Sequence, residues 1–182
     1  PPVQQAAHAK PKPKTVIPKI AQILGVRVGF NGQKALEHVF GPGERWVGGH
    51  SNGQEGWKTK TPKGWIRCDG FSFCKEGEVI EDLEWRATIG DPEASGLPYV
   101  RHMPKNSGWM GVVNLQMSES QVMKAIGRLL PPPAKNKEGD VWTWKAKGYH
   151  VPPTAQLMDA YTEWTAVLAF EKGKLVCIRV MS

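Results

Sequence analysis

The residues best suited to chemistry lie in a glycine-rich segment that runs from Gly48 to Gly53 and carries His50 and Ser51. A histidine can act as a general base toward a serine hydroxyl, and glycines let the backbone come close to a ligand. Adjacent side chains point in different directions, so His50 and Ser51 form no nucleophile–base pair unless the fold supplies a third group. The segment is typical of a structural turn, and we predict no catalytic residue. A small hydrolase or ligand-binding protein that uses this segment with His50 stays an alternative.

The cysteines Cys68, Cys74 and Cys177 follow no metal or disulfide pattern. No CxxC motif or Cys/His cluster with zinc spacing is present, so we predict neither a metal site nor a cofactor. On one straight strand, Cys68 and Cys74 would have Cα atoms about 20 Å apart, whereas a disulfide needs Cα atoms within about 7 Å. A hairpin turn at residues 69–70 would also place other residues opposite them. The cysteines are therefore predicted to be buried free thiols.

Much of the positive charge lies at the N-terminus. The formal net charge is +7, of which residues 1–19 contribute +4 through four lysines and no acid. No single predicted element carries an Arg/Lys stripe with interleaved aromatic residues, so no nucleic-acid partner is expected. The Ala/Pro/Lys composition of residues 1–19 predicts a polyproline-like linker or tail, which would tether the protein to a membrane or cell wall. The carboxylates Glu81, Asp82 and Glu84 are predicted to be solvated charges on a strand.

Tryptophan is the most distinctive residue of the chain, with eight copies. Trp142 and Trp144 would share one face of a strand, because alternate residues of a strand point the same way. Eight tryptophans are more than a core of this size usually takes, so at least two are expected on an open sheet face, where Trp anchors protein partners. The candidate partner-binding residues are Trp46, His50, Trp57, Trp65, Trp142, Trp144 and Trp164.

Two stretches of the chain share one pattern and must supply the elements that position these residues. Residues 25–41 and 111–127 each have an apolar anchor, a polar capping stretch, a short amphipathic helix and a final glycine. The apolar positions of the two helices recur at spacings of three and four; they are Ala35, Leu36, Val39 and Phe40 in the first, and Val122, Met123 and Ile126 in the second. Ser118 and Gln121 form a capping-box pattern, and Gly41 and Gly127 suit left-handed C-caps.

Trp-bearing strands are predicted near residues 45–47 and 64–67 after the first helix, and at 141–145 and 163–168 after the second. Hairpins are predicted at 73–80 and 170–176, and a helix at 16–24. The fold class is therefore predicted to be α+β, with two tandem repeats. Each repeat would be a short helix or helix pair packed on an antiparallel sheet of about four strands. The predicted boundaries are a tail at 1–19, a first repeat at 20–90, a linker at 91–108 and a second repeat at 109–182.

The second repeat resembles a known family. Its motif is Met117-Ser118-x-x-Gln121-Val122-x-x-x-Ile126-Gly127, followed by Trp strands and Phe170-x-x-Gly173-Lys174-Leu175-Val176. This pattern resembles the SmpA/OmlA (BamE) outer-membrane lipoprotein domain, and two such units in tandem resemble the β-lactamase inhibitor protein (BLIP-like) family. The first repeat matches less well, and the cysteines do not obviously reproduce the one disulfide that each inhibitor repeat carries. The resemblance implies an exported bacterial binding module, not an enzyme.

The leading prediction is a non-catalytic extracytoplasmic module that holds a protein partner on a Trp-lined antiparallel sheet. The resemblance implies a periplasmic, cell-envelope or secreted location and a role in envelope assembly or inhibition. Besides the hydrolase alternative, a structural subunit of a larger assembly stays open.

Overall fold

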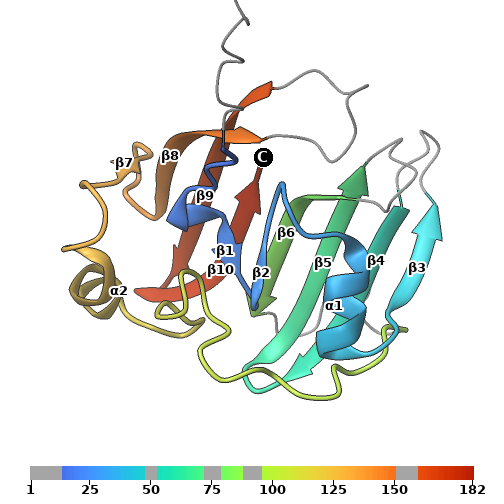
Figure 1. Ribbon diagram of the computed structural model, residues 1–182. Coiled ribbons are helices and arrows are strands. Elements are labelled where there is room, and N and C mark those ends of the chain that lie inside the picture. Colours follow the sequence, from blue (N-terminus) through green and yellow to red (C-terminus); the bar gives the residue numbers. More distant parts are fainter. Residues whose placement is uncertain (1–13, 48–52, 72–78, 88–95, 151–159) are drawn as a thin grey trace, which may run out of the picture.

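The computed structural model describes residues 14–47, 53–71, 79–87, 96–150 and 160–182 (Figure 1). Strands make up 48% of this part and helices 14%. The elements in chain order are η1 (Lys19–Ala21), β1 (Gln22–Ile23), β2 (Val26–Arg27), α1 (Gln33–Phe40), β3 (Glu44–Val47), β4 (Gly53–Lys60), β5 (Lys63–Phe71), β6 (Val79–Ala87), α2 (Glu119–Ile126), β7 (Ala134–Lys135), β8 (Val141–His150), β9 (Ala160–Glu171) and β10 (Lys174–Met181).

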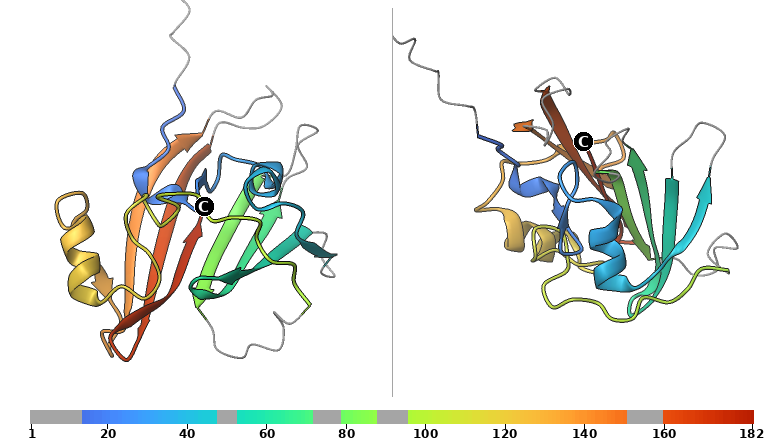
Figure 2. Two further views of the ribbon diagram at one scale, coloured as in Figure 1. Left: turned by 90° about the horizontal axis from the view of Figure 1, so that it is seen from below. Right: turned by 45° about the vertical axis from the view of Figure 1, so that its right-hand side comes forward.

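One antiparallel sheet of eight strands dominates the molecule, in the order β3-β4-β5-β6-β10-β9-β8-β7. The four strands that follow α1 and the four that follow α2 meet where β6 pairs with β10, for example at Leu83 opposite Val180. Strands β1 and β2 form a separate small hairpin. The sheet is strongly twisted, so its two ends point in different directions (Figure 2).

The predicted α+β class of two helix-on-sheet repeats is wrong. The strands form one continuous sheet, and the buried hydrophobic residues of both halves, from Ile20 to Val180, belong to one cluster. Each helix has only eight residues, about 12 Å at 1.5 Å per residue, and covers little of a sheet. Pairing β6 with β10 also removes the two inner edges that separate sheets would expose. The boundaries at residues 19, 90 and 108 stay predictions.

The helices, the β1–β2 hairpin and most of the segment that follows residue 100 lie on one side of the sheet (Figure 2). Both predicted helices are confirmed, because Leu36 and Phe40 of α1 and Val122 and Ile126 of α2 are buried. No helix in the described part of the chain is long and apolar enough to cross a membrane.

The caps of the helices are confirmed in part. Ser118 accepts a hydrogen bond from the Gln121 backbone, and the Gln121 side chain accepts one from Ser118 N, which completes the capping box. Gly41 ends α1 with φ +83°, a value that glycine adopts readily, but its ψ of 176° lies outside the left-handed helical conformation of the predicted cap. Gly127 has φ −60° instead, so its predicted left-handed cap is wrong. There the chain keeps turning, and Leu130 N donates to Ile126 O.

Two other local predictions have different outcomes. The hairpin around Gly173 is confirmed, with Lys174 paired to Glu171. The helix predicted at residues 16–24 is reduced to the single 3-10 turn η1 at Lys19–Ala21, and Gln22–Ile23 form β1 instead. Leu24 and Gly25 have positive φ values of 53° and 80°, which make the tight turn between β1 and β2 and end helical geometry there.

Candidate functional site

The second face of the sheet carries no other element among the described residues, and we call it the open face. Its side chains come from alternate positions of the strands, while the positions between them are buried under the helices. Cross-strand pairing arranges them in rows. One row contains Lys58, Trp65, Arg86, Cys177, Ala169 and Val141, and the next contains Gly56, Arg67, Glu84, Arg179, Val167 and Thr143.

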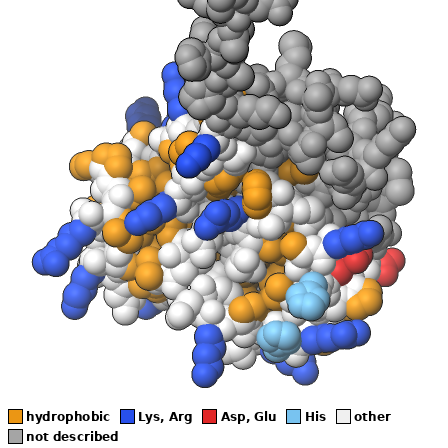
Figure 3. All heavy atoms as spheres, in the orientation of Figure 1, with side chains coloured by type: hydrophobic (Ala, Val, Ile, Leu, Met, Phe, Trp, Pro, Cys, Tyr) orange, Lys and Arg blue, Asp and Glu red, His pale blue; other side chains and the backbone are white. Residues whose placement is uncertain are grey.

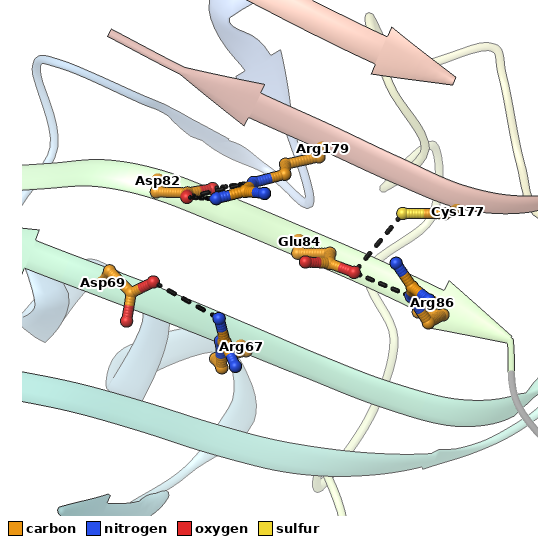
Figure 4. Close-up of polar contacts among 7 residues, drawn as sticks. All are labelled: Arg67, Asp69, Asp82, Glu84, Arg86, Cys177 and Arg179. Carbon is orange, nitrogen blue, oxygen red and sulfur yellow. Dashed lines mark hydrogen bonds and ion pairs between the residues drawn. The ribbon is translucent and has the colours of Figure 1, made fainter. Parts of the chain in front are cut away.

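Ion pairs fill the centre of the open face, on β5, β6 and β10 (Figure 4). Arg179 Nε lies 3.0 Å from both carboxylate oxygens of Asp82, and Arg179 Nη2 also donates to Asp82 Oδ2. Arg86 Nε lies 2.7 Å from Glu84 Oε1. The forked pair with Asp82 fixes the Arg179 guanidinium in orientation as well as in position.

A third, looser ion pair joins Arg67 to Asp69, at 3.8 Å. Burial raises the pKa of the Asp69 carboxyl, Arg67 lowers it in part, and the nearby Asp82 raises it further. For Arg179 the hydrogen bonds with Asp82 raise the pKa of the guanidinium above its ordinary value. The three arginines and three carboxylates of this network balance in formal charge.

The carboxylates of β6 are not the solvated charges expected from the sequence. The Glu84 side chain is only 9% exposed, because it lies between the Arg86 guanidinium and the Cys177 thiol, whose Sγ is 3.4 Å from Glu84 Oε1. Asp82 is mostly buried under Arg179. Burial also raises the pKa of Glu81. The prediction was wrong because it did not pair Glu84 with Arg86 on the same strand, and because the partner of Asp82, Arg179, comes from β10, which local sequence does not show.

Cys177 is held in its neutral form. Burial, and after it the charge of Glu84, raise the pKa of its thiol to about 12, and Arg86 opposes both. A catalytic cysteine needs a lowered pKa, whereas the pKa of this thiol is raised and its Sγ donates to Glu84 Oε1. The prediction of buried free thiols is confirmed for Cys68 and Cys177. Cys74 lies outside the described residues.

Aromatic rings and cations alternate along one row of the open face. Trp65, which is half-buried, has the guanidinium carbons of Arg67 and Arg86 at 5.9 Å and 5.8 Å from its ring centroid. Tyr99 is 52% exposed, with Lys58 Nζ at 4.8 Å and Lys60 Nζ at 5.1 Å from its ring. Such contacts are attractive, at about 0.5–1 kcal/mol each where exposed.

Tyr99 reaches this row because the segment around it runs alongside β4. Lys58 N donates to Pro98 O at 2.7 Å, and Val100 N donates to Lys58 O at 2.9 Å. On the other side, Lys58 is paired with Trp65, and Trp65 with Arg86. We call Tyr99, Lys58, Trp65 and Arg86 the aromatic–cation row.

Four of the predicted partner-binding tryptophans lie in the core, which corrects the expectation of a Trp-lined face. Trp57, Trp142, Trp144 and Trp164 are between 0% and 4% exposed. Their indole N–H groups donate to the carbonyls of Gly41, Gly139, Pro131 and Val28. The rings also pack together, as in Trp142 with Phe170 at 4.6 Å. The core accepts these four tryptophans because each of their polar N–H groups finds a backbone partner.

The other predicted contact residues are placed differently. Trp65 lies on the open face. Trp46 belongs to β3, and its side chain is not among those that the structure describes. His50 and residues 48–52 lie outside the described residues. In the described part, no group of three or more His, Cys, Asp or Glu side chains could hold a metal ion.

Sequence reasoning missed Arg86, Arg179 and Tyr99. A signal was available for the strands, where charged residues at 82, 84 and 86 alternate with apolar ones at 83 and 85. That alternation indicates a strand with one solvent-facing side. It does not show which strands lie beside it.

No protein-family model, curated protein or solved structure matches this chain. The resemblance to the SmpA/OmlA and β-lactamase inhibitor families therefore stays a prediction. Functional inference depends on the geometry of the open face.

Proposed function

We propose that this protein is a non-catalytic binding module that holds a protein partner against the open face of its sheet. The observation that supports this most is the ordered charged network of Arg67, Asp69, Asp82, Glu84, Arg86 and Arg179 beside uncovered small and apolar side chains. Side chains that are already fixed by ion pairs lose little freedom on binding, which favours affinity.

The part of the open face formed by β8 and β9 supplies apolar contact area next to this network. Val167 and Thr143 follow Arg179 in the same row, and Ala169 and Val141 follow Cys177. All four are half-buried although no described element covers them. Apolar area bordered by fixed charges is the usual composition of a protein-binding surface.

The opposite side of the molecule offers a less coherent surface. Figure 3 shows its hydrophobic side chains in several groups separated by polar atoms, with lysine and arginine side chains both between these groups and at the edge. The raised pKa of Cys177 also supports binding over catalysis at the open face. An extracytoplasmic location, a tethering tail and a role in envelope assembly or inhibition are carried into this proposal from the family resemblance and the composition of the chain.

Site-specific photo-crosslinking tests the proposal. A benzophenone side chain would replace Thr143 or Val167 on the open face, and Val112 or Leu129, which are exposed on the segments that cover the other face. We expect one protein from native extract to crosslink from both open-face positions and from neither control position. Crosslinks from the control positions alone, or none above background from the open face, would show that the open face is not the binding surface.

A further inference from the structure

Two carboxylates of the open face lie directly opposite each other on neighbouring strands. Asp69 of β5 pairs with Asp82 of β6 in the register of the sheet, and Figure 4 shows both side chains within the charged network. Like charges that lie opposite each other across two strands repel. The Asp69 side chain is only 16% exposed, so water screens this repulsion incompletely. Where two carboxylates share a site in this way, one of them accepts a proton more readily than an isolated carboxylate does.

The two carboxylates are held differently by their arginines. Arg179 Nε lies 3.0 Å from both oxygens of Asp82, and Arg179 Nη2 also donates to Asp82 Oδ2. The ion pair of Asp69 is longer, with 3.8 Å between Asp69 Oδ2 and Arg67 Nη2. A forked, hydrogen-bonded pair stabilises a carboxylate charge more than a contact at this longer distance. The geometry therefore directs a proton to Asp69.

The groups around Asp69 act on its charge in both directions. Among the described residues, the charged side chains that face it are Arg67 on its own strand, Asp82 on β6 and Arg179 on β10, and Gln54 lies opposite on β4. Burial raises the pKa of the Asp69 carboxyl most, Arg67 lowers it in part, and Asp82 raises it again. Arg179 and a hydrogen bond with Gln54 lower it by less, so the net direction is upward.

We propose that Asp69 makes the open face sensitive to pH, because its protonation in acid releases Arg67 and weakens the binding of the partner protein. The inference rests on the proposed binding function and adds its regulation. When the Asp69 carboxylate takes a proton from water, Arg67 loses this ion pair and the face gains one positive charge. Arg67 then gives up the fixed position that lets a partner bind with little loss of conformational freedom. Asp82 keeps its forked pair with Arg179.

Carboxyl NMR of the full chain tests the site of protonation without a partner. The carbon resonance of the Asp69 carboxyl, assigned by its absence in Asp69→Asn, is expected to titrate at a higher pH than aspartate in an unstructured peptide. The Arg67 Nε–H resonance should shift with the same midpoint, while that of Arg179 should not. An Asp69 midpoint no higher than that of the peptide, or a shift at Arg179 in place of Arg67, would overturn the inference.

The pH dependence of stability is a second measurement. Folding raises the pKa of Asp69, so its neutral form stabilises the folded chain below the ordinary pKa, and this stabilisation is lost as the pH rises through the raised value. Asp69→Asn stays neutral and is expected to have a higher urea midpoint than the parent at pH 7.5, with a difference that shrinks toward pH 4. Glu171→Gln, which removes an exposed charge at the end of β9, should stay close to the parent. A lower midpoint for Asp69→Asn at pH 7.5 would contradict the proposal.

Photo-crosslinking at two pH values tests the regulation. From Thr143 and Val167, the yield of the crosslinked partner should fall about two- to fivefold between pH 7.5 and one pH unit below the measured Asp69 midpoint. Asp69→Asn should give the lower yield at both pH values, and Glu171→Gln should follow the parent.

The outcomes separate the two proposals. If the yield does not depend on pH, or depends on it equally in Asp69→Asn, the binding function stands and the regulation by Asp69 is wrong. If neither open-face position crosslinks a protein at either pH, the proposed function fails, and its regulation fails with it.

Discussion

At the scale of single residues, Glu84 has two partners of different kinds. Its Oε1 accepts from the Arg86 guanidinium at 2.7 Å and from the Cys177 thiol at 3.4 Å. The guanidinium compensates the buried charge, and the thiol can donate only while it is protonated. The chemical inertness of Cys177 is therefore a property that Glu84 helps to set.

Replacing Glu84 is expected to make Cys177 more reactive. With its pKa raised to about 12 from the ordinary 9.0, the thiol has about 1,000-fold less thiolate at pH 8, so native alkylation should be slow. Glu84→Gln removes the nearby negative charge and should speed iodoacetamide labelling of Cys177 by at least about tenfold, measured by mass spectrometry of its peptide. Cys68, buried in the core, is the internal control. Equal acceleration at both cysteines would instead indicate loosening of the whole fold.

Two buried tryptophans are expected to respond differently to the same substitution. Trp164 Nε1 donates to Val28 O at 2.8 Å, whereas Trp85 Nε1 is buried with no acceptor among the described residues. Phenylalanine removes the same volume at both sites. Losing a buried hydrogen bond costs about 1–3 kcal/mol, so Trp164→Phe should lower the free energy of unfolding by that much more than Trp85→Phe. Equal losses in urea denaturation would contradict this and indicate a bound water at Trp85.

At the scale of elements, the local parts of the fold could be predicted because their causes are local. Helix α2 follows from the Ser118–Gln121 box and the spacing of Val122 and Ile126, and the β9–β10 turn follows from Gly173. The path of residues 16–24 could not, because a positive φ at Leu24 depends on packing that overrides the helical preference of that stretch.

The N-cap of α2 gives a prediction at this scale. Ser118→Ala removes the side chain that accepts from Gln121 N, and it should lower stability by about 1 kcal/mol. Lys124→Ala, exposed on the same helix, should change stability by less than about 0.5 kcal/mol. Chemical denaturation measures both. A loss in Ser118→Ala no larger than in the control would mean that tertiary contacts alone hold the helix start.

At the scale of the whole molecule, the two groups of strands depend on each other. Strand β6 pairs with β10 over five residue pairs, Trp164 donates to Val28 O, and Trp109 donates to Ile20 O. These bonds join residues far apart in the chain. Trp164, which was expected to contact a partner, therefore fixes the N-terminal segment to the sheet.

Unfolding of the whole chain is accordingly expected to be a single transition, with coincident far-UV and near-UV circular dichroism curves. Fragments 14–108 and 109–182 are expected to be unfolded when alone, because each would expose its half of the shared core. Mixing them should restore the near-UV signal of the tryptophans. A native-like spectrum from either fragment alone would show that the halves are independent.

The open face illustrates what sequence reasoning cannot reach. The aromatic–cation row brings together positions 58, 65, 86 and 99, which come from four separate segments. The alternation of polar and apolar residues along β4, β5 and β6 predicts that each strand has one polar and one apolar side. Which side lies under the helices, and which strands are neighbours, is decided by long-range pairing. For the same reason, Trp142 and Trp144 do share a face, but it is the buried one.

The short bridge at the start of the described chain has a mechanical consequence. Val16 and Tyr149 exchange two backbone hydrogen bonds, of 2.7 Å and 3.0 Å, and a few residues later Ile20 and Ala21 enter the core. A pulling force on the chain ahead of residue 14 would reach the two Val16–Tyr149 hydrogen bonds first and would break them before it strained the sheet. Since β8 and β4 stand near opposite ends of the strand order, such a pull would enter the sheet far from β4 and β5.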